Sequence, residues 1–109
     1  MDIRHEFIED ALWIEVLIDD KLAGYIKFLF HKKGYIWSAS TMVMPSFRGS
    51  KIATLMYMHA HNLGYEIRPS TDQTPQGKAM WQAFRKAKLP FVRSTWWQRL
   101  WTGSVKLIG

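Results

Sequence analysis

The chain has 109 residues, which is the size of one domain with one sizeable hydrophobic core. Hydrophobic residues make up 48% and charged residues 22%, and there is no cysteine, so disulfides, thiolate metal ligands and cysteine nucleophiles are excluded. The longest segments without Lys, Arg, Asp or Glu, 34–47 and 52–65, are shorter than the roughly 20 apolar residues of a membrane span. The first residues carry acids and lack the apolar run of a signal peptide, so we expect a cytoplasmic protein.

The net charge of +6 is unevenly distributed along the chain. Residues 1–72 carry slightly more acidic than basic residues, and no acidic residue follows Asp72. The basic residues after that point are Lys78, Arg85, Lys86, Lys88, Arg93, Arg99 and Lys106. Such asymmetry favours a polyanionic partner: a nucleic acid, a phosphorylated cofactor, an acidic protein or an anionic membrane surface. The alternative is a solvated basic face without a specific ligand.

The first part of the chain predicts strands. Segments 12–18, 23–30 and 35–44 are rich in β-branched and aromatic residues, and turn signals at 19–21 and 31–34 separate them. Short connections of this kind predict an antiparallel three-stranded meander.

A helical period follows Pro45. The residues predicted to share one helical face are Ile52, Leu55, Met56, His59 and Leu63, and Gly64 is a suitable stop. Segment 65–68 predicts a short strand. Thr74 and Pro75 predict the start of a second helix, whose apolar face holds Met80, Phe84 and Ala87.

This order predicts an α/β (α+β) fold with a mixed sheet. An antiparallel β-β-β meander is followed by a β-α-β unit, in which segments 35–44 and 65–68 run parallel. We expect a single domain over residues 1–109, with the helices packed on the sheet.

The connection over 43–53 predicts an anion site. It reads Val-Met-Pro-Ser-Phe-Arg-Gly-Ser-Lys-Ile-Ala, so a strand ends, a tight loop follows and a helix begins. Backbone N–H groups and the positive end of the helix dipole suit a phosphate or pyrophosphate there. Arg48 and Lys51 add full positive charges. The alternative is a surface turn that needs only Gly49 and a capping serine.

The motif Val-x-Pro-x-Phe-Arg-Gly-x-x-Ile-Ala, followed by an amphipathic helix ending at Gly64, resembles the acetyl-CoA loop of the GNAT superfamily of N-acetyltransferases. The strand order is similar, and so is the later Thr-x-x-Gly-Lys-Ala-Met-Trp segment at 74–81. The resemblance covers roughly residues 12–86. It implies acetyl-CoA as cofactor and acetyl transfer to an amine. The cofactor-binding residues that it implies are Arg48, Gly49, Ser50, Lys51, Ile52 and Ala53 for the pyrophosphate, and Val43 and Met44 for the pantetheine arm.

The chain departs from that family in its chemistry. Lys51 stands where the family has a small residue, and its side chain either crowds the phosphates or pairs with them. The family's acidic tyrosine on the second helix is matched by Trp81, or by Phe84 after a shift of three residues, and neither has a phenol. The third predicted strand has no glutamate to act as base. The catalytic residues are therefore unknown. The short N-terminus implies that the family's acceptor-pocket helices are missing or reduced, as in a compact, degenerate member, a type also found in phage genomes.

Other sites have weaker support. The four histidines, His5, His31, His59 and His61, lack metal-ligand spacing, so we expect no metal site and take His59 as a hydrogen-bonded core residue. The tail carries Trp96, Trp97 and Trp101 among arginines and predicts a protein partner, self-association, a nucleic-acid or membrane contact, or simply a cap on the core. Two functions stay open beside acetyl transfer: a catalytically inactive binding, inhibitory or virion module acting through this basic, Trp-rich end, and a nucleic-acid binder.

Overall fold

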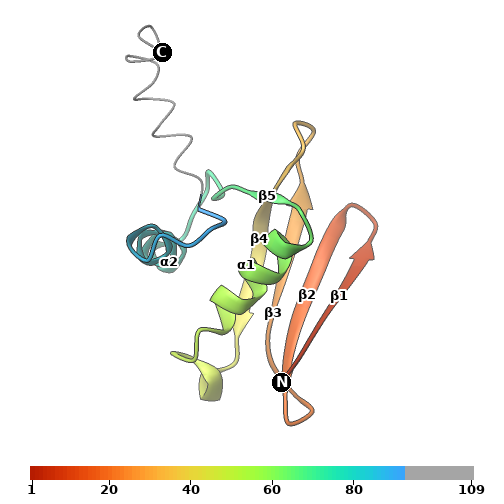
Figure 1. Ribbon diagram of the computed structural model, residues 1–109, viewed down its shortest axis with the longest axis vertical. Helices are drawn as coiled ribbons and strands as arrows, with labels where there is room; N and C mark the ends of the chain where they lie inside the picture. The colour runs from red at the N-terminus through yellow and green to blue at the C-terminus, as the bar shows by residue number, and fades with distance from the viewer. Residues whose placement is uncertain (93–109) are drawn as a thin grey trace, which may run out of the picture.

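The computed structural model describes residues 1–92, which form one five-stranded sheet covered by helices (Figure 1). The strands lie in the sheet in the order in which they occur along the chain. Their bounds are β1 Asp2–Ile8, β2 Ala11–Ile18, β3 Lys21–Phe30, β4 Tyr35–Val43 and β5 Glu66–Ile67. β1 to β4 are antiparallel to their neighbours, and β5 runs parallel to β4. The predicted meander, the mixed sheet and the parallel pair are confirmed.

The first strand, β1, corrects the sequence prediction, which placed no strand before residue 12. β1 pairs with β2 over its whole length, from Asp2 opposite Leu17 to Ile8 opposite Ala11. It is an edge strand in which only Ile3 is shielded from solvent, so few apolar residues mark it in the sequence. The antiparallel part of the sheet therefore has four strands.

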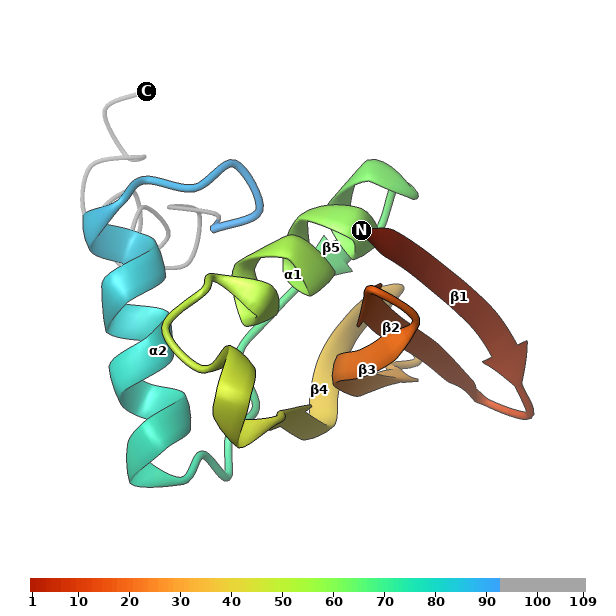
Figure 2. The ribbon, with the colours of Figure 1, turned by 90° about the horizontal axis from the view of Figure 1, so that it is seen from below.

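α1 lies on one face of the sheet, and α2 lies beyond the β4 edge (Figures 1 and 2). A 3-10 turn, η1 Pro45–Phe47, leads from β4 toward α1 Ile52–Asn62, and α2 Pro75–Lys86 follows β5. α1 crosses the middle of the sheet, and α2 lies beside α1 (Figures 1 and 2). Gly64, with φ +100°, follows the end of α1, and the Thr74 side chain accepts a hydrogen bond from the Gly77 N–H at 3.1 Å. Within residues 1–92, neither helix has the length and apolar character needed to cross a bilayer.

The core has two parts, and α1 belongs to both. Its sheet-facing side, with Ile52 and Met56, packs on buried residues of β2 and β3. Tyr57, from the adjoining side of the helix, lies within 5.1–5.5 Å, centroid to centroid, of four aromatic rings. These belong to Phe28, Trp81, Phe84 and Phe91. We call these five residues the aromatic cluster.

The predicted helical faces were partly wrong. Leu63 is exposed, whereas Tyr57, which the prediction left off the buried face of α1, is 1% exposed. On α2, Phe84 is buried as predicted, but Ala87 is exposed and Trp81 takes its place in the core. In each helix, the buried face is therefore rotated from the predicted face toward the aromatic cluster.

A histidine pair joins the edge strand β1 to α1. The His5 Nδ1 and His59 Nε2 atoms are 2.9 Å apart, so one imidazole donates and the other accepts. Partial burial lowers the pKa of His59 below its usual value, and the nearby charge of His5 lowers it further. His59 is thus hydrogen-bonded, as predicted, but half-buried at the rim rather than in the core.

We expect the protein to lose stability on mild acidification because of this pair. Since the pKa of His59 is lower in the folded than in the unfolded state, the unfolded state takes up its proton at higher pH. The free energy of unfolding should therefore fall as the pH drops through about 6.5 and level off below the folded-state pKa. Urea titrations at pH 7.5 and 5.5 measure this change. His59→Asn should weaken it and His61→Asn, on the same helix, should preserve it; equal pH dependence in all three proteins would contradict the assignment.

Candidate functional site

The predicted anion-binding loop lies between β4 and α1, as the sequence indicated. Arg48, Gly49, Ser50 and Lys51 are exposed in this connection. Ile52 is 2% exposed and anchors the start of α1 in the core. The remaining predicted residues, Val43, Met44 and Ala53, are half-buried, the first two at the end of β4 and the last in the first turn of α1. The eight predicted residues therefore lie in two runs, 43–44 and 48–53, on either side of the 3-10 turn η1.

The loop backbone leaves that N-terminus open. Gly49 has φ +82° and Lys51 has φ +61°, so the chain turns twice through the left-handed region. Lys51 is the N-cap residue, and no side chain caps the helix. The first intrahelical hydrogen bond runs from the Leu55 N–H to the Lys51 carbonyl at 3.1 Å, which leaves the earlier N–H groups of the first turn without partners inside the helix. The alternative for this turn, in which a serine side chain caps the helix, is therefore wrong.

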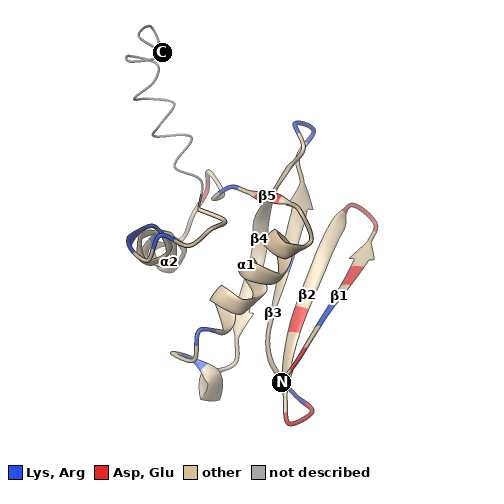
Figure 3. Cartoon of the chain, viewed as in Figure 1, with Lys and Arg blue, Asp and Glu red and all other residues tan. Residues whose placement is uncertain are grey.

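The charges around the loop are positive and unpaired. Within residues 1–92, neither Arg48 nor Lys51 has a carboxylate within salt-bridge distance. The Arg48 Nε–H donates to the Val43 carbonyl at 3.3 Å, which turns this side chain back toward the end of β4. Figure 3 shows basic residues at the loop and on α2, whereas most acidic residues lie at β1, β2 and their turns. The helix dipole and this distribution together favour an anion at the start of α1.

A glycine on β3 fixes the position of the loop against the sheet. A Cβ atom on Gly24 would lie 2.8 Å from the Met42 carbonyl oxygen and 2.9 Å from a methyl carbon of Ile52. The Met44 N–H also donates to the Ala23 carbonyl at 2.8 Å. Because Gly24 has no side chain, β4 and the start of α1 can approach β3 closely at this point.

β4 has an unpaired edge next to the loop. Its parallel pairing with β5 covers only Tyr35 opposite Glu66 and Ile36 opposite Ile67, extended by the Arg68 N–H donating to the Ile36 carbonyl at 2.9 Å. From Trp37 to the end of the strand, no described strand pairs with that edge. Its backbone groups can therefore bind an extended ligand as a neighbouring strand would.

A β-bulge brings two hydroxyls together on this part of β4. The register between β3 and β4 shifts between Lys27 and Phe28, and Ala39 is the extra residue. As a result Ser38 and Thr41 both lie opposite core residues of β3, on the face that α1 covers. Their side-chain oxygens are 2.7 Å apart.

The Tyr57 hydroxyl is near these two residues, and it is the unexpected feature of the site. It is buried, and no hydrogen bond of regular geometry satisfies it. Burial raises the pKa of Tyr57 to about 12, against the influence of Ser38, Trp81 and Thr41, whose polar groups are near enough to lower it. The phenol is therefore protonated at neutral pH and available as a donor.

The sequence prediction missed this phenol. It placed the family's tyrosine position on the second helix, at Trp81, whose ring lies 5.5 Å from that of Tyr57 in an edge-to-face arrangement. The phenol comes instead from α1 and lies beside the matched tryptophan. A tyrosine five residues after the start of α1, outside the set of residues predicted to share one helical face, was the only signal in the sequence.

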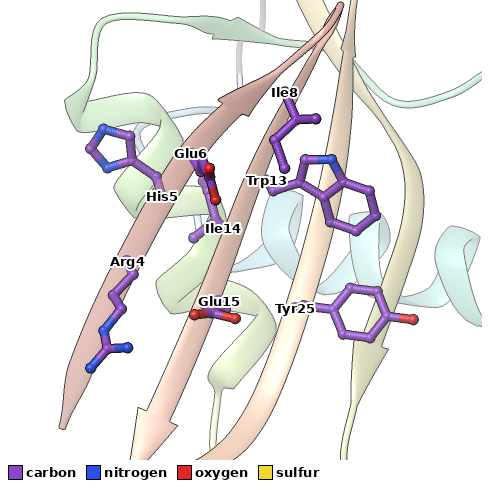
Figure 4. Close-up of a pocket in the computed structure, with 8 residues that line it drawn as sticks. All are labelled: Arg4, His5, Glu6, Ile8, Trp13, Ile14, Glu15 and Tyr25. Atoms are coloured by element: carbon purple, nitrogen blue, oxygen red, sulfur yellow. The ribbon is translucent and has the colours of Figure 1, made fainter.

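A cavity on the other face of the sheet includes no predicted site residue. It measures about 440 Å³ and is lined by residues of β1, β2 and β3. Figure 4 shows Glu6, Glu15, Trp13 and Tyr25 on this face, with the helices behind the strands. A ligand there would be separated by the sheet from the loop and from the Ser38 hydroxyl.

The predicted partner contacts of the tail fall on residues after position 92. Trp96, Trp97 and Trp101, with Arg93, Arg99 and Lys106, lie outside the described residues.

Comparisons with solved structures show the fold. A structure of AAC(6')-Iy with the bisubstrate analogue CoA-S-monomethyl-acetylneamine matches with a TM-score of 0.53 and 14% identity, over 72% of this chain and 61% of that one. The aminoglycoside N-acetyltransferase AAC(6')-Iy in complex with CoA matches with a TM-score of 0.56 and 13% identity, over 72% and 67%. The present chain thus spans about three fifths of the length of the first of these.

Comparisons of sequence show the family. No curated protein sequence matches the chain. The model of the acetyltransferase (GNAT) family matches residues 1–66, which include β1 to β4, the loop and α1. Because the family model matches this part of the chain and the fold agrees with that of the two solved structures, the chain belongs to the GNAT acetyltransferase family.

Proposed function

We propose that the protein binds acetyl-CoA at the 48–53 loop and transfers the acetyl group to an amine. The observation that carries the proposal is the uncapped N-terminus of α1, held open by positive φ angles at Gly49 and Lys51 and flanked by unpaired positive charge. These features suit a pyrophosphate, because backbone N–H groups and the helix dipole both act on the anion. The family match spans the same residues.

The chain offers residues for the pyrophosphate and for the pantetheine arm of the cofactor. The N–H groups of the loop and of the first turn of α1 would hold the pyrophosphate, with Lys51 as an additional cation. Val43 and Met44 would line the pantetheine arm, which would extend along the unpaired edge of β4 toward Ser38. At about 3.3 Å per residue, Ser38 lies about 16 Å along the strand from Val43. The arm would thus deliver its thioester to the β-bulge.

When bound, acetyl-CoA would supply an activated acyl group: an amine nitrogen would form a C–N bond to the carbonyl carbon as the C–S bond breaks, and the proton lost by nitrogen would go to the sulfur or to solvent. The chain's residues would position the thioester and hold its carbonyl. No carboxylate lies on β4, and Trp81 is buried as a member of the aromatic cluster. Such transfer would depend mainly on positioning rather than on a protein acid or base.

Thermal shift of the full chain tests this proposal. We expect CoA and acetyl-CoA to raise the melting temperature in a concentration-dependent way, as ligands that bind only the folded state do. Release of free CoA thiol in the presence of a generic amine would then measure transfer. A duplex oligonucleotide serves as comparison: a salt-sensitive shift with DNA and none with CoA would favour the nucleic-acid alternative and contradict the proposal.

A further inference from the structure

We propose that Trp81, Tyr57, Ser38 and Thr41 form a one-way relay of hydrogen-bond donors, which runs from the core to the edge of β4 and presents the Thr41 hydroxyl to the carbonyl oxygen of a bound acyl thioester. This inference rests on the proposed function, because it assigns the acyl end of the same site. We call these four residues the donor relay.

The starting observation is the buried Tyr57 hydroxyl, which no hydrogen bond of regular geometry satisfies. Burying a hydroxyl without a partner is unfavourable, because the group gives up its hydrogen bonds to water. Phenylalanine would fill the same space in the aromatic cluster without that cost. The polar groups that act on the hydroxyl belong to Ser38, Thr41 and Trp81 and therefore offer it partners after a small adjustment. In unliganded sites such hydrogen bonds are commonly long or poorly aligned.

The direction of the relay follows from which groups can donate and accept. The Trp81 indole N–H is only a donor, so its one role toward Tyr57 is to donate to the phenolic oxygen. Tyr57 must then direct its own proton away from the indole, toward Ser38. The Ser38 and Thr41 oxygens are 2.7 Å apart, and a Ser38 hydroxyl that accepts from Tyr57 donates to Thr41. The Thr41 proton is left pointing outward.

Exposure along the relay has the same direction. Trp81 is 3% and Tyr57 1% exposed, Ser38 is half-buried and Thr41 is exposed. The exposed end lies on β4 between the bulge and the loop, along the edge that lacks a strand partner. Each hydroxyl that accepts a hydrogen bond becomes a stronger donor, and this polarisation is greatest in a dry core. The aromatic cluster supplies that environment.

The relay donates hydrogen bonds and transfers no proton. Burial raises the pKa of Tyr57 far above neutral pH, so its phenol keeps its proton. Such a phenol is a poor proton donor to a leaving group, but it can act as a fixed hydrogen-bond dipole. A donor on the carbonyl oxygen would stabilise the negative charge that develops there as nitrogen attacks. Thr41 would touch the substrate, whereas Tyr57, Ser38 and Trp81 would act as positioning residues.

Tyr57→Phe in the full chain is the direct test. We expect its free energy of unfolding to stay equal or rise, because the variant removes an unsatisfied hydroxyl and keeps the ring. Its affinity for CoA should be unchanged, because CoA lacks the thioester carbonyl that Thr41 would contact. Its affinity for acetyl-CoA should fall about fivefold. Infrared difference spectra with carbonyl-labelled acetyl-CoA give a second readout: the thioester carbonyl band of the bound ligand should move back toward its position in free acetyl-CoA.

Two further variants sharpen the result. Thr41→Val removes the last donor at nearly constant shape and should shift the carbonyl band at least as far, whereas Thr41→Ser, which keeps the hydroxyl, should restore it. Tyr25→Phe removes a phenol on the opposite face of the sheet and should behave like the wild type.

The outcomes separate the relay from the proposed function. A wild-type chain that binds neither CoA nor acetyl-CoA would overturn the proposed function. CoA binding with the same carbonyl band in wild type, Tyr57→Phe and Thr41→Val would overturn the relay alone. A large loss of stability in Tyr57→Phe together with an unchanged carbonyl band would also overturn it, because the hydroxyl would then serve the core alone.

Discussion

Gly49→Val should strongly weaken CoA binding while the domain stays folded. Gly49 has φ +82°, where a β-branched side chain is strained by roughly 1–3 kcal/mol. The space around the residue is open, so nothing in the core resists the substitution. The strain should instead shift the loop out of the left-handed conformation that leaves the first N–H groups of α1 available. We expect a loss of at least about tenfold in affinity, which is about 1.4 kcal/mol, by isothermal titration with CoA.

The same helix provides a matched control at its other end. Gly64 has φ +100°, and a Cβ atom there would also meet nothing within 4 Å. Gly64→Val should therefore cost a similar amount of stability and leave CoA affinity intact. Equal affinity in folded Gly49→Val and wild type would remove the loop from the site, whereas equal losses in both variants would mean that strain at either end of α1 is enough.

The elements around this loop were predictable because their signals are local. Pro45 ends a strand, Gly49 marks a turn with positive φ, and the sequence period changes at Ile52, so a few residues determine each boundary. The parallel pairing of segments 35–44 and 65–68 followed from the right-handed connection between them. Fold class and the position of the candidate cofactor loop thus depended on short-range chemistry.

Two features were missed for tertiary reasons. β1 is stabilised by full-length pairing with β2, which no pattern within residues 2–8 reveals. Tyr57 was missed because the prediction assumed that a helix buries one stripe, whereas α1 packs on the sheet along one side and on α2 and Phe91 along the next. The donor relay could not be found without knowing that a bulge at Ala39 turns Ser38 and Thr41 to the same face.

The other large effect is expected in the aromatic cluster. Trp81→Ala should lower the free energy of unfolding by about 3–5 kcal/mol, as removal of a buried tryptophan does. The indole is 3% exposed and makes edge-to-face contacts with Tyr57 at 5.5 Å and with Phe84 at 5.5 Å. Because α2 buries only Trp81 and Phe84 among its own residues, this loss should weaken its docking beside α1. Urea titration of the full chain measures the change.

Trp13→Ala is the matched control for that loss, because it removes the same side chain from the open face of the sheet. Trp13 is half-buried there, with the Lys27 ammonium 5.3 Å from its ring centre, and we expect a cost of about 1 kcal/mol. Similar costs for the two variants would mean that the aromatic cluster does not hold α2 in place. A much larger cost for Trp81→Ala would establish that the position matched to the family's catalytic tyrosine supports the core in this chain. The only phenol left at the site would then be the one on α1.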